Sequence, residues 1–317
     1  MNNGVVYKST GSWYTVKAEN GTFYECRIKG KFRIKGIKST SPVSVGDHVQ
    51  FDIETKGDET IGIITKIGER DNYIIRKSVN LSKQTHIIAA NIDVAFLLIT
   101  LNNPPTFTSF IDRFLVTAEA YEIRAVLLFN KIDTYNEDEL LEVKLLAALY
   151  RTIGYECLGI SASTGKNVDK VKEMMRSKVS MFSGHSGVGK STLVNTIESN
   201  LNLKTTQISN QHMQGQHTTT FAEMYDLSFG AQIIDTPGIK GFGIVEVDKE
   251  ELGGYFPEFF KLKEYCKFNN CLHIEEPHCA VKEAVAEEEI ASSRYRSYLQ
   301  IIEGEEEHYR KDIYTNE

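Results

Sequence analysis

Residues Gly184–Thr192 read Gly-His-Ser-Gly-Val-Gly-Lys-Ser-Thr and match the phosphate-loop pattern G-x-x-x-x-G-K-[ST] at every fixed position. Such a loop directs backbone N–H groups at a phosphate chain. A predicted strand, Val179–Ser183, precedes it, and a predicted helix over Ser191–Glu198 follows, so the context is that of a nucleotide-binding α/β domain rather than a Gly-rich turn. We expect Lys190 to reach the outer phosphates and Ser191 to bind Mg²⁺. The expected nucleotide contacts from this loop are Gly184, His185, Ser186, Gly187, Val188, Gly189, Lys190, Ser191 and Thr192.

A second motif, Asn130-Lys131-Ile132-Asp133, follows the predicted buried strand Arg124–Phe129. The Asp133 carboxylate can accept hydrogen bonds from the ring N1–H and the exocyclic amine of guanine, whereas adenine presents an acceptor at N1. This mismatch predicts selection of guanine over adenine. After the third predicted strand come Ser161, Ala162 and Ser163, where a backbone N–H is expected to meet the guanine oxygen.

A third motif, Asp235-Thr236-Pro237-Gly238, follows the predicted strand Ala231–Ile234. By itself the string also fits a Pro-Gly turn. Behind a buried strand it predicts that Asp235 holds Mg²⁺ through water and that the Gly238 N–H senses the γ-phosphate. The polar segment Thr205–Thr220 precedes it and is expected to be a switch whose hydroxyls face Mg²⁺.

The order of these motifs is unusual, because the guanine motif and Ser161-Ala162 precede the phosphate loop. Cutting and rejoining a chain at surface loops preserves a sheet, so the order indicates a circularly permuted GTPase domain. From Ile92 onward, strands and helices alternate, which predicts a parallel sheet covered on both faces. Besides those named above, the predicted elements are strands Ile92–Thr100, Tyr155–Ile160 and Phe221–Leu227 and helices Phe107–Tyr121, Glu137–Arg151 and Val168–Arg176.

Residues 1–70 carry five short apolar runs separated by turn signals, which predicts a small barrel of the oligonucleotide-binding type. Residues 71–90 are expected to be a connecting segment. Alternate positions in the barrel region are basic, which would place the cations on one face of a strand. That face suggests a polyanion contact, although a solvated barrel face remains an alternative. The basic residues are Arg27, Lys29, Lys31, Arg33 and Lys35.

The C-terminal region contains the pattern C-x₄-C-x-H-x₅-C, formed by Cys266, Cys271, His273 and Cys279. Three thiolates and one imidazole are a structural Zn²⁺ set. Buried thiols, a disulfide, and His278 as a replacement ligand remain open alternatives. Residues Ala280–Asp312 are expected to form two helices. A basic and aromatic cluster on them either touches RNA or only covers a helix surface; its members are Arg294, Tyr295, Arg296 and Tyr298.

Composition excludes several classes of protein. The chain has 317 residues, of which 41% are hydrophobic and 25% charged, as in an ordinary globular protein. The longest apolar run, Val94–Ile99, is too short to span a bilayer. The first residues lack the charged-then-apolar pattern of a signal peptide. We therefore expect a cytoplasmic protein without a membrane contact.

These features together resemble the circularly permuted GTPases of small ribosomal subunit biogenesis, the RsgA family. The resemblance covers nearly the whole chain: the barrel, the permuted order, G-H-S-G-V-G-K-S-T, G-x-H-T-T-T, D-T-P-G and the Cys₃His tail. It implies three regions: an OB-fold RNA-binding barrel (1–70), a permuted GTPase domain (71–244) and a zinc-binding helical domain (245–317). It also implies a monomer that binds GTP or GDP, Mg²⁺ and Zn²⁺.

The implied activity is GTP hydrolysis stimulated by the small (30S) ribosomal subunit during its late maturation, with the barrel on 16S rRNA. Thr219 is the expected switch threonine and Mg²⁺ ligand. Ile239 follows the D-x-x-G motif, where a water-orienting Gln is usual, and it has no hydrogen-bonding group. We therefore expect His217 to orient the attacking water, with Lys190 and Thr219 also in the catalytic set.

Two other functions fit the sequence. One is a nucleotide-dependent rRNA-binding sensor module in which turnover is incidental, and turnover with and without small subunits separates that alternative. An ATP-dependent enzyme is the other, and competition between nucleotides separates it.

Overall fold

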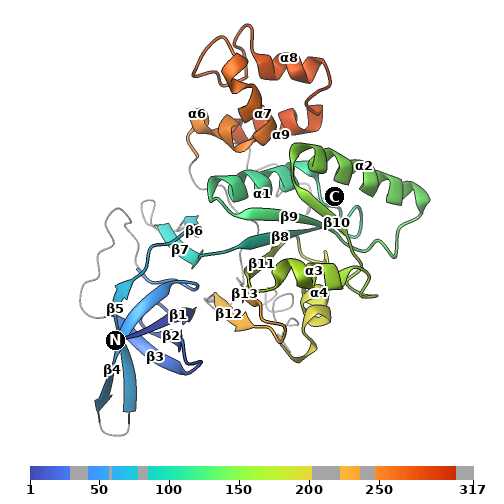
Figure 1. The fold of residues 1–317 in the computed structure, drawn as a ribbon. Helices are drawn as coiled ribbons and strands as arrows, with labels where there is room; N and C mark the ends of the chain where they lie inside the picture. Colours follow the sequence, from blue (N-terminus) through green and yellow to red (C-terminus); the bar gives the residue numbers. More distant parts are fainter. Residues whose placement is uncertain (29–41, 57–58, 78–84, 202–221, 236–246, 305–317) are drawn as a thin grey trace, which may run out of the picture.

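The computed structural model describes residues 1–28, 42–56, 59–77, 85–201, 222–235 and 247–304. A barrel at the N-terminus lies beside a sheet that is covered by helices, and a group of C-terminal helices lies over one of the helical layers (Figure 1). The fold class predicted from the sequence is confirmed.

The barrel has five strands, in the order β1-β2-β3-β5-β4, and β4 closes the barrel by pairing with β1. Four pairings are antiparallel, and β3 pairs with β5 in parallel. Apolar side chains alternate with polar ones, so every second residue fills the interior, where Val6, Val16, Phe51 and Ile64 are fully buried. The strands are β1 (Asn2–Ser9), β2 (Tyr14–Ala18), β3 (Phe23–Ile28), β4 (His48–Lys56) and β5 (Glu59–Ile67).

The central sheet continues from the barrel in the order β12-β13-β11-β8-β9-β10. All neighbours in it are parallel except β12, which runs antiparallel to β13. The predicted parallel sheet therefore has one antiparallel strand, because β12 and β13 are joined by a tight turn in which Leu227 N–H donates to Ala231 O at 2.8 Å. The strands are β8 (Val94–Ile99), β9 (Arg124–Phe129), β10 (Glu156–Gly159), β11 (Val179–Ser183), β12 (Glu223–Asp226) and β13 (Gln232–Asp235).

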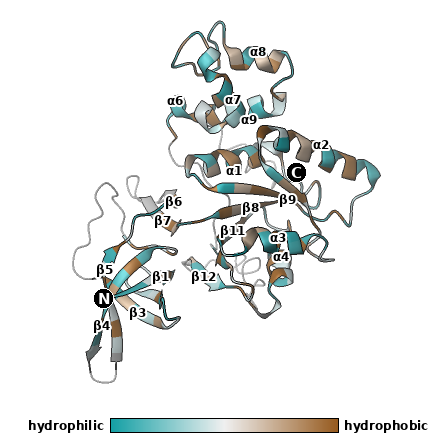
Figure 2. Ribbon diagram, in the orientation of Figure 1, coloured by the Kyte–Doolittle hydropathy of each residue, from teal (hydrophilic) through white to brown (hydrophobic). Residues whose placement is uncertain are grey.

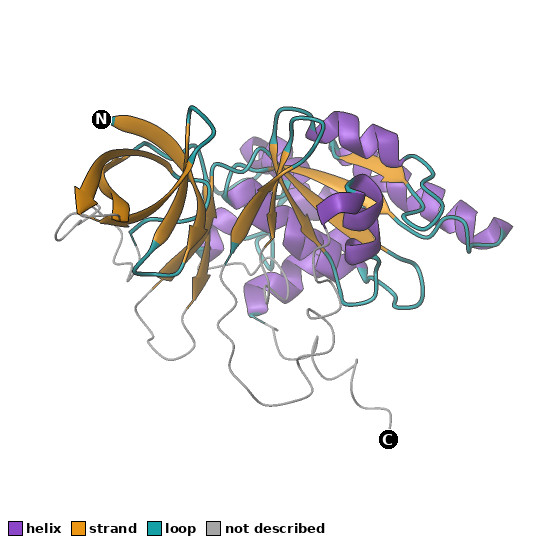
Figure 3. Cartoon of the chain, turned by 90° about the horizontal axis from the view of Figure 1, so that it is seen from below, coloured by secondary structure: helices purple, strands orange, loops and turns teal. Residues whose placement is uncertain are grey.

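Helices cover both faces of this sheet (Figure 3). Side chains of β8 alternate between two cores: Leu97 packs with residues of α1 and α2, whereas Phe96 packs with residues of α3 and α4. This double burial explains why the central strands are almost uniformly apolar (Figure 2). The helices are α1 (Thr108–Ala120), α2 (Glu137–Ile153), α3 (Val168–Met175) and α4 (Lys190–Ile197), and the short η1 (Ser199–Leu201) follows α4.

Residues 71–90 are not a plain connection. They contain a hairpin of β6 (Tyr73–Lys77) and β7 (Thr85–Ala90). Ile74 and Ala89 are buried in the core that also holds Val45 of the barrel region. The expectation failed because each strand is short and is held by contacts with residues far away in the sequence, which no local pattern reveals.

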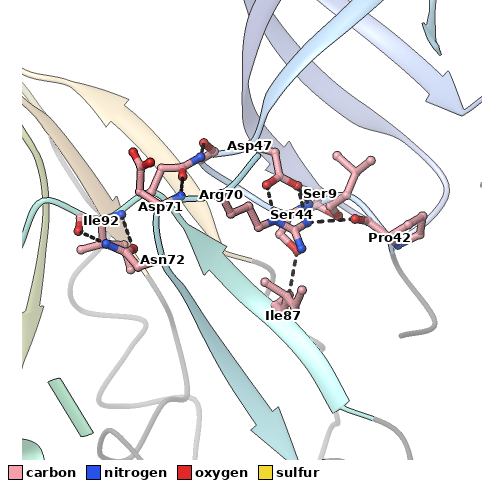
Figure 4. Close-up of polar contacts among 12 residues, drawn as sticks. Ser9, Pro42, Ser44, Asp47, Arg70, Asp71, Asn72, Ile87 and Ile92 are labelled. Atoms are coloured by element: carbon pink, nitrogen blue, oxygen red, sulfur yellow. Dashed lines mark hydrogen bonds and ion pairs between the residues drawn. The ribbon is translucent and has the colours of Figure 1, made fainter. Parts of the chain in front are cut away.

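A polar network fastens the barrel to the sheet (Figure 4). The carboxylate of Asp47 accepts hydrogen bonds from Nε and Nη2 of Arg70, both at 2.6 Å, and both side chains are buried. Arg70 also donates to Pro42 O at 2.9 Å. Two residues later, Asn72 exchanges hydrogen bonds with the backbone of Ile92, just before β8. The chain from 70 to 72 therefore fixes the barrel against the start of the sheet.

The C-terminal helices are short and pack on α1. They are α6 (Lys249–Leu252), η3 (Gly253–Tyr255), α7 (Pro257–Leu262), η4 (Lys263–Tyr265), α8 (Ala280–Ala286) and α9 (Ser292–Glu303). Their core includes Phe256, Phe259 and Tyr298, together with Val116 of α1. In the part of the chain described, none of the helices combines the length and hydrophobicity needed to cross a bilayer.

Candidate nucleotide and metal sites

Asn130 joins the three loops that the sequence assigns to the nucleotide. It lies directly after β9 and is 2% exposed. Its Nδ2 donates to Val188 O at 2.8 Å, and its Oδ1 accepts from Ala162 N–H at 2.9 Å. The phosphate loop, the guanine motif and residues 161–163 therefore meet at the carboxyl edge of the sheet, where open α/β sheets bind ligands.

Two positions of the phosphate loop require glycine, because the backbone there lies very close to neighbouring residues. Gly189 has φ +100°, and a Cβ there would lie 2.4 Å from Asn130 Nδ2. Gly184 has φ +139°, and a Cβ there would lie 2.7 Å from Leu98 O. A side chain at either position would force the loop away from its neighbours and would also be strained at these φ values.

Lys190 lies at the start of α4 with its ammonium turned into the loop. Its Nζ donates to Gly184 O at 2.6 Å and to His185 O at 2.7 Å. Burial lowers its pKa to about 8. Phosphate oxygens accept hydrogen bonds from an ammonium as these carbonyls do, and a partly desolvated cation attracts an anion more strongly than a solvated one.

The guanine motif presents Asp133 at the surface. The Ser163 hydroxyl donates to Asp133 Oδ2 at 3.1 Å. The pKa of Asp133 is lowered, mainly by a hydrogen bond from the Ser161 side chain, so the carboxylate is ionised and can only accept. Ile132 lies against Gly159, and Lys131 donates to Asn103 O. The two residues that precede Asp133 are therefore held by neighbouring segments of the chain.

A fourth loop, residues 101–107, also lies at this edge, and the sequence motifs did not predict it as part of the site. It receives the hydrogen bond of Lys131, and its backbone at Leu101 donates to the Tyr135 hydroxyl at 3.0 Å. Just beyond it, the Phe110 ring of α1 lies over the His185 ring, with centroids 3.8 Å apart. The signal was present, because the loop follows the buried strand β8 and so leaves the sheet at its carboxyl edge.

Asp235 ends β13, which is the parallel neighbour of β11 with Met181 opposite Ile234. Asp235 is therefore close to the point where β11 enters the phosphate loop, and Ser191 follows in the first turn of α4. The other residues expected at this site lie outside the described residues: His217, Thr219, Gly238 and Ile239.

On the barrel, Arg27 is exposed in β3, and its guanidinium lies 3.8 Å from the centroid of the Trp13 ring. The remaining cations expected on this face, Lys29, Lys31, Arg33 and Lys35, lie outside the described residues.

The expected metal ligands come together in the C-terminal region. Ligand atoms of Cys266, Cys271, His273 and Cys279 all lie within 4.8 Å of one another, and all four residues are buried. Cys266 Sγ is 3.7 Å from His273 Nδ1 and 4.0 Å from Cys279 Sγ, and His273 Nδ1 is 3.3 Å from Cys279 Sγ. With Zn–S bonds of about 2.3 Å and a Zn–N bond of about 2.0 Å, a tetrahedron separates its ligand atoms by about 3.5–3.8 Å. The donor set and its spacing therefore fit a tetrahedral metal ion.

Two of the three alternatives for these cysteines, a disulfide and His278 as a ligand, are not supported by the structure. All five cysteines of the chain are described and are free, so none forms a disulfide. His278 is exposed and does not belong to the group of four.

The loop that carries His273 is bound to α9, because the hydroxyls of Tyr295 and Tyr298 donate to His273 O and Leu272 O at 2.7 and 2.6 Å.

The basic and aromatic cluster on α9 is not an RNA surface at its centre. Arg294 and Tyr298 are each 1% exposed. The Arg294 guanidinium donates to Asp112 Oδ1 of α1 at 2.8 Å and to both Glu258 oxygens of α7 at 2.7 and 3.1 Å. Only Arg296 of the basic pair is exposed. The cluster therefore joins the C-terminal helices to α1.

Comparison with known proteins agrees with this arrangement. The family model of the RsgA N-terminal domain matches residues 3–64, and that of the RsgA GTPase matches residues 67–245. The small ribosomal subunit biogenesis GTPase RsgA of Christiangramia forsetii is 73% identical over 98% of this chain and 99% of its own length. The protein of the same name from Flavobacterium johnsoniae is 69% identical over 98% of this chain and 96% of its own.

Solved structures give the same result. YjeQ from Thermotoga maritima superimposes with a TM-score of 0.76 and 34% identity, covering 96% of this chain and 98% of its own. YloQ, a circularly permuted GTPase, superimposes with a TM-score of 0.72 and 29% identity, covering 99% of this chain and 96% of its own. With the nucleotide loops in permuted order at one edge of the sheet, this protein is a circularly permuted GTPase that belongs to the RsgA family.

Proposed function

We propose that this protein hydrolyses GTP during late assembly of the small ribosomal subunit and that the 30S subunit stimulates the reaction. The observation that carries the proposal is the contact of Asn130 with both Val188 and Ala162, which joins the phosphate and guanine loops in one site. The names of the full-length relatives support the ribosomal role.

In this proposal GTP or GDP lies along the phosphate loop, with Asp133 on the guanine and Lys190 on the outer phosphates. Mg²⁺, which GTPases use to neutralise phosphate charge, is held by Ser191 and Thr219, with Asp235 reaching it through water. Gly238 N–H senses the γ-phosphate.

In this proposal each of the three regions has its own function. The barrel (1–70) binds 16S rRNA, supported by Arg27 stacked on Trp13 and by the basic sequence that follows. The permuted domain (71–244) hydrolyses GTP, and the helical domain (245–317) holds structural Zn²⁺ through Cys266, Cys271, His273 and Cys279. We propose that the protein works as a monomer in the cytoplasm.

The test is co-sedimentation of the protein with purified 30S particles, loaded in turn with a non-hydrolysable GTP analogue, GDP or an ATP analogue. Co-sedimentation specific to the GTP analogue, with faster turnover when subunits are present, is the expected result. Equal turnover with and without subunits would favour the sensor in which hydrolysis is incidental, and equal use of ATP would remove the guanine assignment.

Within this proposal His217 orients the attacking water. Ile239 has no group that can do so, and His217 lies two residues before Thr219 in the expected switch. His217→Ala should lower the stimulated kcat by roughly 10²–10⁴, the range for a general acid–base group. Binding of GTP and of 30S should be retained. Stimulated turnover within a few-fold of wild type would show that the ribosome, not His217, positions the water.

A further inference from the structure

Among the residues that the structure describes, the barrel and the nucleotide-binding sheet form one continuous sheet of eleven strands. The junction is the pairing of β1 with β12, where Lys8 lies opposite Glu223. Their side chains also form an ion pair, with Lys8 Nζ 3.2 Å from Glu223 Oε2. The strand that leads out of the expected switch segment is therefore bonded to the barrel at its first residue.

The last residue of β12 is held by the barrel as well. Asp226 accepts a hydrogen bond from the Tyr7 hydroxyl of β1 at 2.6 Å and from Lys17 Nζ of β2 at 2.5 Å. Lys17 in turn lies over the Tyr7 ring, with its Nζ 5.4 Å from the centroid. Within its own hairpin, Asp226 also accepts from Gln232 Nε2 at 3.3 Å. One carboxylate thus joins two barrel strands to β12 and β13.

These two contacts bear on the nucleotide site through the register of the β12–β13 hairpin. Glu223 lies opposite Asp235, and Asp226 lies opposite Gln232. The two ends of β12 that the barrel holds are therefore paired with the two ends of β13. The strand β12 is only four residues long, so the few backbone hydrogen bonds that it makes with β13 do not fix its position alone. Its position also depends on the contacts that it makes with the barrel. A shift of the barrel at β12 would therefore reach Asp235 through this pairing.

We propose that Asp226 is a positioning residue through which the barrel, by way of Tyr7 and Lys17, sets the place of Asp235 for GTP hydrolysis. The inference rests on the proposed function, in which Asp235 serves the Mg²⁺ site and the subunit stimulates turnover. The barrel touches the subunit, and the strand pairing carries its position to the end of β13.

The test compares Tyr7→Phe and Asp226→Asn with Thr15→Val in the full-length protein. Thr15→Val is the matched control, because it removes another side-chain hydrogen bond of the barrel, from Thr15 Oγ1 to Glu25 Oε1 at 2.7 Å, which does not involve β12. Both test variants should keep 30S affinity within about twofold, since Tyr7 is 7% exposed and Asp226 carries the wrong charge for a phosphate contact. Stimulated kcat should fall about five- to tenfold, the lower range for coupling between sites.

A second readout follows the hairpin itself. Hydrogen exchange of backbone amides in residues 222–235 should be faster in both variants and unchanged in Thr15→Val, with amides of β3 showing that the barrel stays folded. Lys17→Arg keeps a cation for Asp226 and should retain stimulation, whereas Lys17→Met should lose it at an unchanged affinity for GTP.

The outcomes separate the two proposals. If wild-type turnover does not respond to 30S, the proposed function fails. If wild type responds and both Tyr7→Phe and Asp226→Asn keep wild-type stimulation and exchange, the positioning role of Asp226 is overturned. Loss of stimulation that only accompanies loss of 30S affinity also overturns it, because the contact would then serve binding alone.

Discussion

Asp133 is the residue that we expect to set the choice of nucleotide. Its carboxylate is ionised, exposed and aimed by Ser161 and Ser163, so it offers acceptors only. Asp133→Asn replaces one acceptor oxygen with a donor and should shift preference from guanine to xanthine nucleotides, which carry an acceptor in place of the exocyclic amine. Competition of GTP and XTP against a fluorescent nucleotide measures the shift. Unchanged affinities for both would remove Asp133 from the base contact.

The lowered pKa of Lys190 predicts that nucleotide binding depends on pH. Burial lowers its pKa from 10.5 to about 8, so at pH 9 the amine is largely neutral before a nucleotide binds. Phosphates favour the ammonium, so binding should take up a proton at pH 9, and affinity should fall as pH rises from 8 towards 10.5. Calorimetry at pH 9 in two buffers of different protonation heat measures the uptake. Equal heats in both buffers would contradict it, and Lys190→Arg, which stays charged, is the control.

Single residues of the candidate site could be predicted from the sequence where they belong to a short motif. Asn130–Asp133 and the phosphate loop were read from local spacing, and the structure places them together. The contact of the Phe110 ring with the His185 ring and the burial of Arg294 were not predictable, because each depends on which distant segment lies opposite. Arg294 looks like a surface cation in its own helix, and only Asp112 and Glu258 make it an interior one.

At the scale of elements, the cysteine and histidine cluster lies in a region built of short helices. The four expected metal ligands lie on short turns between α7 and α8, so the position of each depends on the others. Since metal binding supplies folding free energy to such sites, Cys271→Ser should lose zinc and loosen residues 247–304 while GTP binding persists. Metal analysis together with limited proteolysis tests this, with the half-buried Cys157→Ser as the control. Zinc retained at full stoichiometry in Cys271→Ser, or absent from carefully prepared native protein, would contradict the assignment.

Strands and helices with strong periodicity were predicted nearly to their ends, as with Arg124–Phe129 and Val179–Ser183, whose bounds are those of β9 and β11. Two features of the strands were not predicted. The direction of β12 depends on a tight turn rather than on composition, and the β6–β7 hairpin depends on Val45 and other distant residues for its burial. Pairing partners and strand direction are tertiary properties, which alternation along one strand does not encode.

For the whole molecule, α1 is the element that joins the C-terminal helices to the nucleotide edge. Phe110 near its start touches His185 of the phosphate loop, and Asp112 pairs with Arg294 of α9. The Tyr150 hydroxyl of α2 donates to the same Asp112 oxygen at 2.7 Å. Arg294 also lies 4.5 Å from the centroid of the Phe256 ring. A buried cation with two carboxylates and an aromatic face therefore joins the C-terminal helices to α1.

Removal of this cation should be costly, because it leaves Asp112 buried without its charge partner. Breaking a buried pair from one side typically destabilises a protein by about 3–5 kcal/mol. We expect Arg294→Met to lower the free energy of unfolding by about that amount, with residues 247–304 released first, as followed by urea unfolding and proteolysis. Arg296→Met, on the exposed face of the same helix, is the matched control and should change stability by less than about 0.5 kcal/mol.

A double-mutant cycle tests the same contact. Asp112→Asn should lower the free energy of unfolding less in the Arg294→Met background than in wild type, because the two changes remove the same contact. Additive losses, or equal stability of the two arginine variants, would show that the network does not hold the regions together.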